Sequence, residues 1–423
     1  MNLDSDEFRL RDISAQAVLR LICAEPGQSR GALADALSLP RPTVIALVRK
    51  LLDQGWLQEH AGVEAAHAGR RSALLHLRRD RLVLLGAEVG DDGVRVLATS
   101  LTGDVLARLH EPCACVDDAE AMLARAARLL LGAHARVAAL GRSVVAIGAG
   151  LAGRIDEFTG CVSATHPCAW AGVPVARRLG EHLRGTPLQR CALHVQGGAQ
   201  VAGVGELEFG VSRPRLPLLS LWLGERVEAA LVGDGPDGPC RLLPGLAHMT
   251  LSLDGTACRC GRRGCVEAMV GLRAMILPGE AASMVAVTQR LGEADAARAV
   301  ERAGRHLGVV LGNLWMSHDP GRIVVAGPAA SLGAPLLAPA LAALAEQARV
   351  AGRVPPEVTV SRFGDEAVAL GAAAFARYRL TRPLRPPSRL TSLFARYGYR
   401  YHPPSPRASA RQQAAGSLST TGC

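Results

Sequence analysis

The sequence lacks several features that would have set its class at once. No apolar run is long enough to span a bilayer, and the N-terminal stretch MNLDSDEFRLRD has no signal-peptide pattern. We therefore expect a cytoplasmic chain with no membrane partner. Aromatic residues make up only 3%, and Lys50 is the single lysine among 48 basic residues. We attribute this bias to genome composition and infer no function from it.

A disulfide framework is also missing. Of the eleven cysteines, eight are scattered along the chain without paired spacing. Thiols stay reduced in the cytoplasm, where clustered cysteines more often indicate a metal than a disulfide. The scattered cysteines are Cys23, Cys113, Cys115, Cys161, Cys168, Cys191, Cys240 and Cys423.

Length and charge set wide limits. A chain of 423 residues with 49% hydrophobic content can bury more than one core, so two or three domains are expected. The net charge of +10 is concentrated in residues 380–423, which hold seven arginines and no acidic residue. The remainder is nearly balanced, with 41 basic and 38 acidic residues, so global charge does not by itself indicate DNA binding. Residues 378–423, rich in Pro, Arg, Ser and Ala, are expected to form a disordered basic tail.

The most informative motif reads HMTLSLDGTACRCGRRGC, from His248 to Cys265. It places one imidazole and three thiols in one short loop, at His248, Cys258, Cys260 and Cys265. These four ligands suit a closed tetrahedral zinc site, and the glycines let the backbone turn tightly around the ion. The alternative is a set of ordinary buried or redox cysteines. A structural zinc does not by itself indicate a function.

The first eighty residues predict a DNA-binding head. Apolar residues recur at helical spacing in residues 13–22, 33–37 and 44–52. Ser29 is a good N-cap for the second helix, and residues 39–42 form the turn before the third. Helices of these lengths are typical of a helix-turn-helix, whose last helix enters the major groove with its N-terminus first.

A hairpin after the third helix favours a winged version of this motif. Residues 56–59 and 72–77 predict its two strands, with Gly69-Arg70-Arg71 near the tip. Arginines there suit a phosphate or a narrow minor groove. The alternative is a three-helix module for protein contacts. The residues expected to face DNA are Ser29, Arg30, Arg41, Thr43, Arg49, Lys50, Arg70 and Arg71.

Beyond residue 80 the pattern changes to an α/β alternation. Strands are expected at 82–89, 94–100 and 104–109, followed by a long helix over 118–140 and a strand at 144–150. A second cycle repeats this pattern, with strands at 218–223 and 227–232, a helix over 296–316 and a strand at 322–325. Two α/β halves, each opening on a hairpin meander, predict a two-lobed actin-like ATPase fold of the ribonuclease H-like type.

Taken together, these segments resemble the ROK family of repressors and sugar kinases, from about residue 10 to residue 377. The resemblance rests on the winged helix and on the stretches GAEVGDDGVRVLATSLTGDVL, IGAGLAGRID, CRCGRRGC, RIVVAGP and FGDEAVALGAAAFA. The cysteine motif is the most diagnostic of these. A helix-turn-helix head belongs to the repressor branch of the family, so the resemblance implies a sugar-responsive, oligomeric transcriptional repressor.

The same resemblance implies that kinase chemistry has been lost. The family's first phosphate loop, Asp-x-Gly-Gly-Thr, corresponds here to Glu88-Val89-Gly90-Asp91-Asp92, and the second, Gly-Thr-Gly-Ile-Gly, to Gly224-Glu225-Arg226-Val227-Glu228. Both gain carboxylates that would repel an anion. The family's Asn-Asp-Ala-Asn, which holds the general base, becomes Gly197-Gly198-Ala199-Gln200. Because glycine accepts no proton, no catalytic residue is expected and the chain is expected not to be an enzyme.

The sugar contacts of the family are also depleted. Its Glu-x-Gly-His element is Gly245-Leu246-Ala247-His248 here, which removes one carboxylate. Of five polar contacts, only His248 and Glu267 remain, and Glu267 has an alternative role as a cap or ion pair at the helix beginning at Val266. A hexose held through two side chains would bind weakly. Arg262 and Arg263 are expected to be exposed, and His194 to be a core histidine or, alternatively, to line the pocket.

The sequence therefore predicts a transcriptional repressor of ROK type, cytoplasmic and nucleoid-associated. Its expected domains are a winged head at 10–79, a regulatory domain at 80–377 with the zinc loop at 248–265, and the tail at 378–423. Its expected partners are an operator duplex, other copies in a dimer or tetramer, and a sugar-derived effector from carbohydrate metabolism. The main alternative is a sugar kinase with a fused regulatory head, and a further alternative is a scaffold without a ligand.

Overall fold

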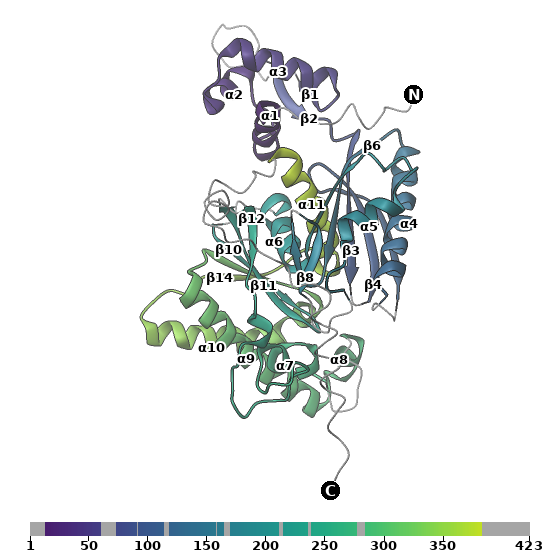
Figure 1. The fold of residues 1–423 in the computed structure, drawn as a ribbon. Helices are drawn as coiled ribbons and strands as arrows, with labels where there is room; N and C mark the ends of the chain where they lie inside the picture. The colour runs from purple at the N-terminus through teal and green to yellow at the C-terminus, as the bar shows by residue number, and fades with distance from the viewer. Residues whose placement is uncertain are drawn as a thin grey trace, which may run out of the picture. The chain divides into compact units, whose positions relative to one another are not determined.

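The computed structural model describes residues 13–60, 73–90, 92–113, 118–157, 159–164, 170–210, 215–235, 238–276 and 284–382 (Figure 1). The expected wing tip with Arg70 and Arg71 lies outside the described residues, as does the tail from residue 383 onward. The last helix ends at Thr381, so the chain stays folded past position 377, where the tail was expected to begin.

The N-terminal head consists of three helices and a two-stranded hairpin. Its elements are α1 (Ile13–Ala24), α2 (Arg30–Leu37), α3 (Arg41–Asp53), β1 (Leu57–His60) and β2 (Leu74–Leu77). The apolar stripes of the three helices meet in one core, which also buries Trp56 completely. The connection from α1 to α2 hydrogen-bonds to β2, since the Leu75 amide donates to the Gln28 carbonyl oxygen at 2.9 Å. This arrangement confirms the expected winged helix-turn-helix.

The first lobe is a five-stranded sheet in the order β5-β4-β3-β6-β9. β3, β4 and β5 form an antiparallel meander, whereas β6 and β9 run parallel to β3. The elements of this part are β3 (Leu82–Gly90), β4 (Gly93–Ser100), β5 (Val105–Pro112), α4 (Ala119–Ala138), β6 (Ser143–Leu151), β7 (Arg154–Asp156), β8 (Cys161–Ala164), α5 (Val175–His182), β9 (Ala192–Gly197) and α6 (Gly198–Phe209). The amphipathic helix α4 packs on the sheet with its apolar side.

The second lobe repeats this topology in the order β12-β11-β10-β13-β14. Its first three strands are antiparallel and the last two run parallel to β10. Its elements are β10 (Leu218–Leu223), β11 (Val227–Gly235), β12 (Gly238–Leu242), η1 (Leu246–His248), α7 (Val266–Val270), η2 (Leu272–Ala274), α8 (Met284–Arg290), α9 (Ala294–His318), β13 (Arg322–Ala326), η3 (Pro328–Leu332), α10 (Ala334–Ala351), β14 (Glu357–Val360), η4 (Gly364–Glu366) and α11 (Ala367–Thr381). The repeat confirms the two-lobed actin-like fold.

Helices α6 and α11 form the layer between the two sheets (Figure 1). α11 follows the second lobe in sequence, yet it packs on β3 and β6 of the first. The approach is close enough to require glycine. A Cβ added at Gly148 would lie 1.8 Å from the Ala372 carbonyl oxygen, and one added at Gly86 would lie 1.9 Å from that of Ala369. The apolar face of the first sheet is therefore covered by α11, the last helix in the described part of the chain.

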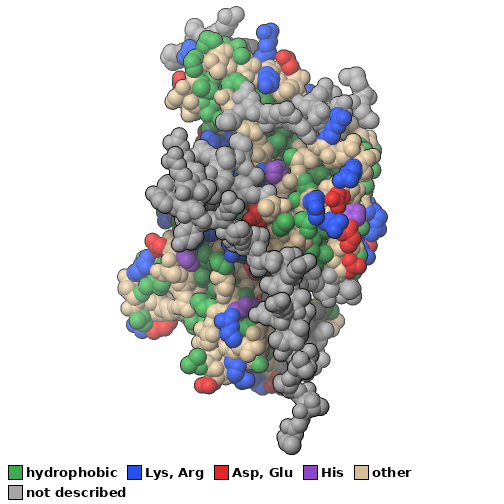
Figure 2. Space-filling view, in the orientation of Figure 1, with side chains coloured by type: hydrophobic (Ala, Val, Ile, Leu, Met, Phe, Trp, Pro, Cys, Tyr) green, Lys and Arg blue, Asp and Glu red, His purple; other side chains and the backbone are tan. Residues whose placement is uncertain are grey.

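Charges on the surface of the first lobe are paired rather than sorted by sign. Glu111 accepts from both Arg125 and Arg128, and Arg178 pairs with Glu181. Figure 2 shows basic and acidic side chains intermingled on its visible face.

Among the described helices, none is by itself both long and apolar enough to cross a membrane. The bent pair α2 and α3 meets that test jointly, by length and composition alone.

The tight contact of α11 on the first sheet gives a stability prediction. Gly148→Ala forces α11 and β6 apart, and we expect it to lower the free energy of unfolding by about 3 kcal/mol or more. Gly180→Ala, in α5, is the matched control: its added Cβ meets nothing within 4 Å, so we expect a neutral or slightly stabilising effect. Denaturant unfolding compares the two, and equal stabilities would contradict the packing described.

Candidate functional site

The loop between η1 and α7 folds tightly through its own backbone. The Cys258 amide donates to the Arg262 carbonyl oxygen at 2.8 Å, and the Leu251 amide donates to that of Gly264 at 2.7 Å. Gly264 has a φ of 63°, and a Cβ there would lie 1.7 Å from the Ser252 carbonyl oxygen, so only glycine fits. The local backbone thus brings residues distant by up to seventeen positions to one point.

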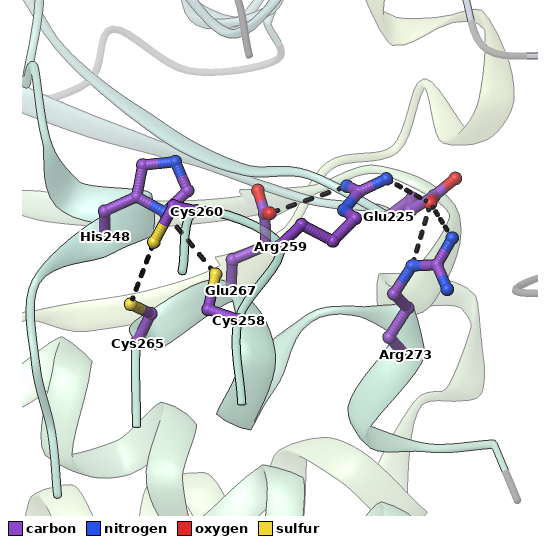
Figure 3. A network of polar contacts seen from close by, with 8 residues as sticks. All are labelled: Glu225, His248, Cys258, Arg259, Cys260, Cys265, Glu267 and Arg273. Carbon is purple, nitrogen blue, oxygen red and sulfur yellow. Dashed lines mark hydrogen bonds and ion pairs between the residues drawn. The ribbon is translucent and has the colours of Figure 1, made fainter. Parts of the chain in front are cut away.

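The four expected metal ligands meet at that point (Figure 3). Their ligand atoms all lie within 4.8 Å of one another. The Sγ atoms of Cys260 and Cys265 are 3.7 Å apart, as are Cys258 Sγ and His248 Nδ1. A tetrahedral zinc with Zn–S bonds of about 2.3 Å separates its sulfur ligands by about 3.8 Å. The cluster could therefore hold a metal ion such as zinc, and His248 would bind it through Nδ1.

The thiols of the cluster differ in acidity. The backbone N–H of Arg262 lowers the pKa of Cys260, and the Arg262 side chain adds to this effect. Burial raises the pKa of Cys265, helped by its contacts with the other two thiols. Because a metal binds thiolates, loading the site must release protons, and acid must oppose it.

A network of ion pairs adjoins this loop (Figure 3). Arg259, between two of the cysteines, reaches Glu225 at 2.8 Å and Glu267 at 3.5 Å. Arg273 of η2 approaches the same Glu225 oxygen at 2.7 Å. Glu267 in the first turn of α7 is buried, and the ion-pair role considered for it is thus present. The outward Arg262 and Arg263 are exposed, as expected.

Carboxylates also lie near one end of β3 and one end of β11, in the segments expected to correspond to the family's phosphate loops. Glu228 of β11 accepts a hydrogen bond of 3.3 Å from the backbone N–H of Gly153, which lies in the first lobe. Glu88 of β3 pairs with Arg95 at 3.0 Å. Burial raises the pKa of Glu88 to about 7, although Arg95 opposes the shift. Both carboxylates are therefore held by partners within the chain.

The segment expected to have lost the general base joins β9 to α6. Gly197 is the N-cap of α6, and Gly198 begins the helix. The side-chain amides of Gln196 and Gln200, on either side of these glycines, have partners within the chain. The Gln196 side-chain oxygen accepts from the Gly197 N–H, and the Gln200 side-chain nitrogen lies 3.7 Å from Cys240 Sγ. His194 packs edge-on against Phe375, and burial lowers its pKa to about 4, with a contribution from Arg379. Its ring is a neutral packing group.

The head presents one face of α3 to solvent. Arg41, Thr43, Arg49 and Lys50 are exposed there, whereas Val44 and Val48 are buried. The other two described residues expected to face DNA have structural partners. Ser29 Oγ caps α2 by accepting from the Ala32 N–H, and Arg30 pairs with Glu59 of β1 at 2.5 Å.

The ion pairs beside the metal loop have no signal in the sequence. Arg259 lies inside the cysteine motif without an expected role, and Arg273 lies outside every motif. Their common partner Glu225 is expected from the sequence only as an added carboxylate in a phosphate loop. The contacts join positions up to 48 apart, and no local pattern specifies them. Only the alternation of acidic and basic residues around the two loops could have suggested pairing.

The chain belongs to the ROK family, whose model matches residues 84–379. A second model, described as winged helix-turn-helix DNA-binding, matches residues 11–58. The xylose repressor of Caldicellulosiruptor bescii is 21% identical over 387 residues, covering 86% of this chain and 95% of the repressor. The comparison thus includes the head as well as the ROK domain.

Solved structures support the same fold. A ROK family transcriptional regulator, described as a homologue of the Escherichia coli MLC protein, superposes with a TM-score of 0.69 at 19% identity, covering 89% of this chain and 97% of that chain. A ROK glucokinase from Streptomyces griseus gives 0.57 at 21% identity, covering 70% and 99%. The regulator structure thus matches a larger share of this chain than the glucokinase structure does.

Proposed function

We propose that the protein is a DNA-binding transcriptional repressor without kinase activity, acting in the cytoplasm at the nucleoid. Its head at 10–79 would bind an operator, and its ROK domain at 80–377 would respond to a ligand. The observation that carries this proposal is the exposed basic face of α3 on a winged head, joined to a ROK domain. A kinase would have no use for such a face.

Residues near the ends of β3, β9 and β11 oppose kinase catalysis. Phosphoryl transfer requires bare backbone for the phosphates and a carboxylate base beside the sugar hydroxyl. At the aligned positions, Gly198 offers no proton acceptor, and Asp92 and Glu228 add negative charge. ATP phosphates would have to displace carboxylates from partners they already have. A sugar kinase would therefore have to work with two altered phosphate loops and without the family's general base.

The ligand, if one binds, is recognised in a different way from a family hexose. Glu267 is the one surviving carboxylate of the expected sugar contacts, and Arg259 already pairs with it. A sugar hydroxyl would compete with a guanidinium for that carboxylate. The network of Arg259, Arg273 and Glu225 suits a sugar derivative that carries its own charge. It suits a neutral hexose less well.

Zinc, held by His248, Cys258, Cys260 and Cys265, has a structural role in this proposal. Four protein ligands leave no open coordination position for a substrate. The ion would fix the loop that carries Arg259, and through it the positions of Glu225 and Glu267.

For the assembly, a dimer or tetramer would space two heads for a palindromic operator. Ligand binding between the lobes would change that spacing.

Gel-shift assays with genomic fragments test the DNA claim. We expect retardation that is sequence-selective and falls with salt, because arginines displace counterions from phosphates. Arg41→Ala and Arg49→Ala should each weaken binding about tenfold and lower the salt slope by about one. Arg20→Ala, an exposed arginine on α1, is the matched control and should bind normally. Absence of selective retardation at every fragment would refute the proposal.

A coupled ADP-release assay over a panel of hexoses and amino sugars tests the loss of catalysis. We expect no turnover above the rate without sugar, because Gly198 cannot accept the hydroxyl proton. A ROK glucokinase run in parallel serves as the positive control. Clear turnover with any sugar would favour the kinase alternative.

Metal analysis tests the zinc site. We expect one zinc per chain, lost after Cys258→Ser and retained after Cys161→Ser, whose thiol lies outside the cluster. At free zinc 100-fold above its dissociation constant, binding should stabilise the fold by about 2.7 kcal/mol. Lowering the pH should release the metal, since its ligands must be deprotonated. Equal zinc content in the two variants would exclude this ligand set.

A further inference from the structure

The exposed face of α3 has an apolar centre. Ile45 is 52% exposed, while the apolar stripe of the same helix, Val44, Leu47, Val48 and Leu51, is buried in the head. Isoleucine has a lower helix propensity than the long polar residues usual on an exposed helical surface, because its branched Cβ restricts the side chain. Neither packing nor helix propensity accounts for Ile45 at this position.

The surroundings of Ile45 indicate what could cover it. A shallow depression follows this face of α3 and is lined by Pro42, Ile45, Ala46, Arg49, Lys50, Asp53 and Gln54. The positions are spaced three and four apart, so they form one stripe along the helix. Figure 2 shows basic side chains and hydrophobic ones together on the head.

The distribution of charge along this stripe favours a polyanion as the occupant. Arg41 precedes it at the helix N-terminus, Arg49 and Lys50 follow Ile45 by about one turn, and the acidic Asp53 comes last. The helix dipole adds partial positive charge at the N-terminal end. The stripe therefore has an apolar centre between cationic positions, with its acidic residue at the end that would point away from the duplex.

We propose that Ile45, with Ala46 beside it, contacts the 5-methyl group of a thymine in the major groove and so determines base specificity at one position of each half-site. The thymine methyl is the apolar group on the major-groove edges of the four base pairs. An aliphatic side chain flanked by arginines matches a methyl flanked by phosphates. This inference rests on the proposed function, because it presumes that α3 enters the groove.

The experiment uses the full chain and begins by selecting bound duplexes from a randomised library. Each thymine of the selected site is then replaced by deoxyuridine, which removes the methyl and leaves base pairing intact. For the wild type we expect one position per half-site at which the replacement weakens binding about three- to tenfold.

Ile45→Ala is the informative variant, and it keeps α3 helical because alanine has the higher propensity. On the thymine duplex it should lose about as much affinity as the wild type loses on deoxyuridine. At the same position it should be insensitive to the replacement. Leu140→Ala, which truncates a leucine that is 68% exposed outside the head, is the matched control and should retain full sensitivity.

Each outcome separates the two proposals. If the wild type selects a sequence but tolerates deoxyuridine at every thymine, or if Ile45→Ala stays as sensitive as the wild type, the methyl contact is wrong and DNA binding stands. If Ile45→Ala binds DNA normally but loses self-association in sedimentation, the face is a protein interface and the contact is again wrong. If no duplex is selected, the proposed function fails and this inference with it.

Discussion

The close approach of α11 to the first sheet is the constraint on which the rest of the molecule depends. Gly86 and Gly148 leave no room for a side chain between helix and strands, and Gly371 allows α6 to approach α11 in the same way. Two sheets of identical topology can therefore share one thin helical layer. That layer also holds the junction of β9 and α6, where Gly197 and Gly198 lie.

Glu225, Glu228 and Glu267 are each paired with a group of the chain itself. Glu225 has two arginine partners, Glu267 has one, and Glu228 accepts from the Gly153 backbone. Because these carboxylates already have partners, they are electrostatically satisfied without a ligand. A ligand that binds to them would have to replace those partners. In the proposed regulator, a ligand that wins this exchange would have to rearrange contacts that the chain already makes.

Much of this could be predicted from periodicity. The three helices of the head, the strand meanders and the long helices α4 and α9 agree with their expected positions to within a few residues, because each has a strong apolar repeat. The metal loop is local in sequence, and its four ligands do meet.

Long-range contacts could not be predicted from the sequence. Ion pairs such as Arg30 with Glu59, or Arg259 with Glu225, depend on tertiary placement. The tail was expected to begin at residue 378, yet Tyr378 and Arg379 are buried within α11.

The position of α11 in the chain has a consequence for synthesis. The first sheet precedes the second lobe in sequence, but α11, which covers its inner face, is the last of the described elements to be synthesised. Until then the apolar surface around Leu84 and Ala146 has no cover, and closing so long a loop costs entropy before any contact repays it. The first lobe is thus completed only once α11 has been synthesised, and a chain truncated before α11 would expose an aggregation-prone sheet.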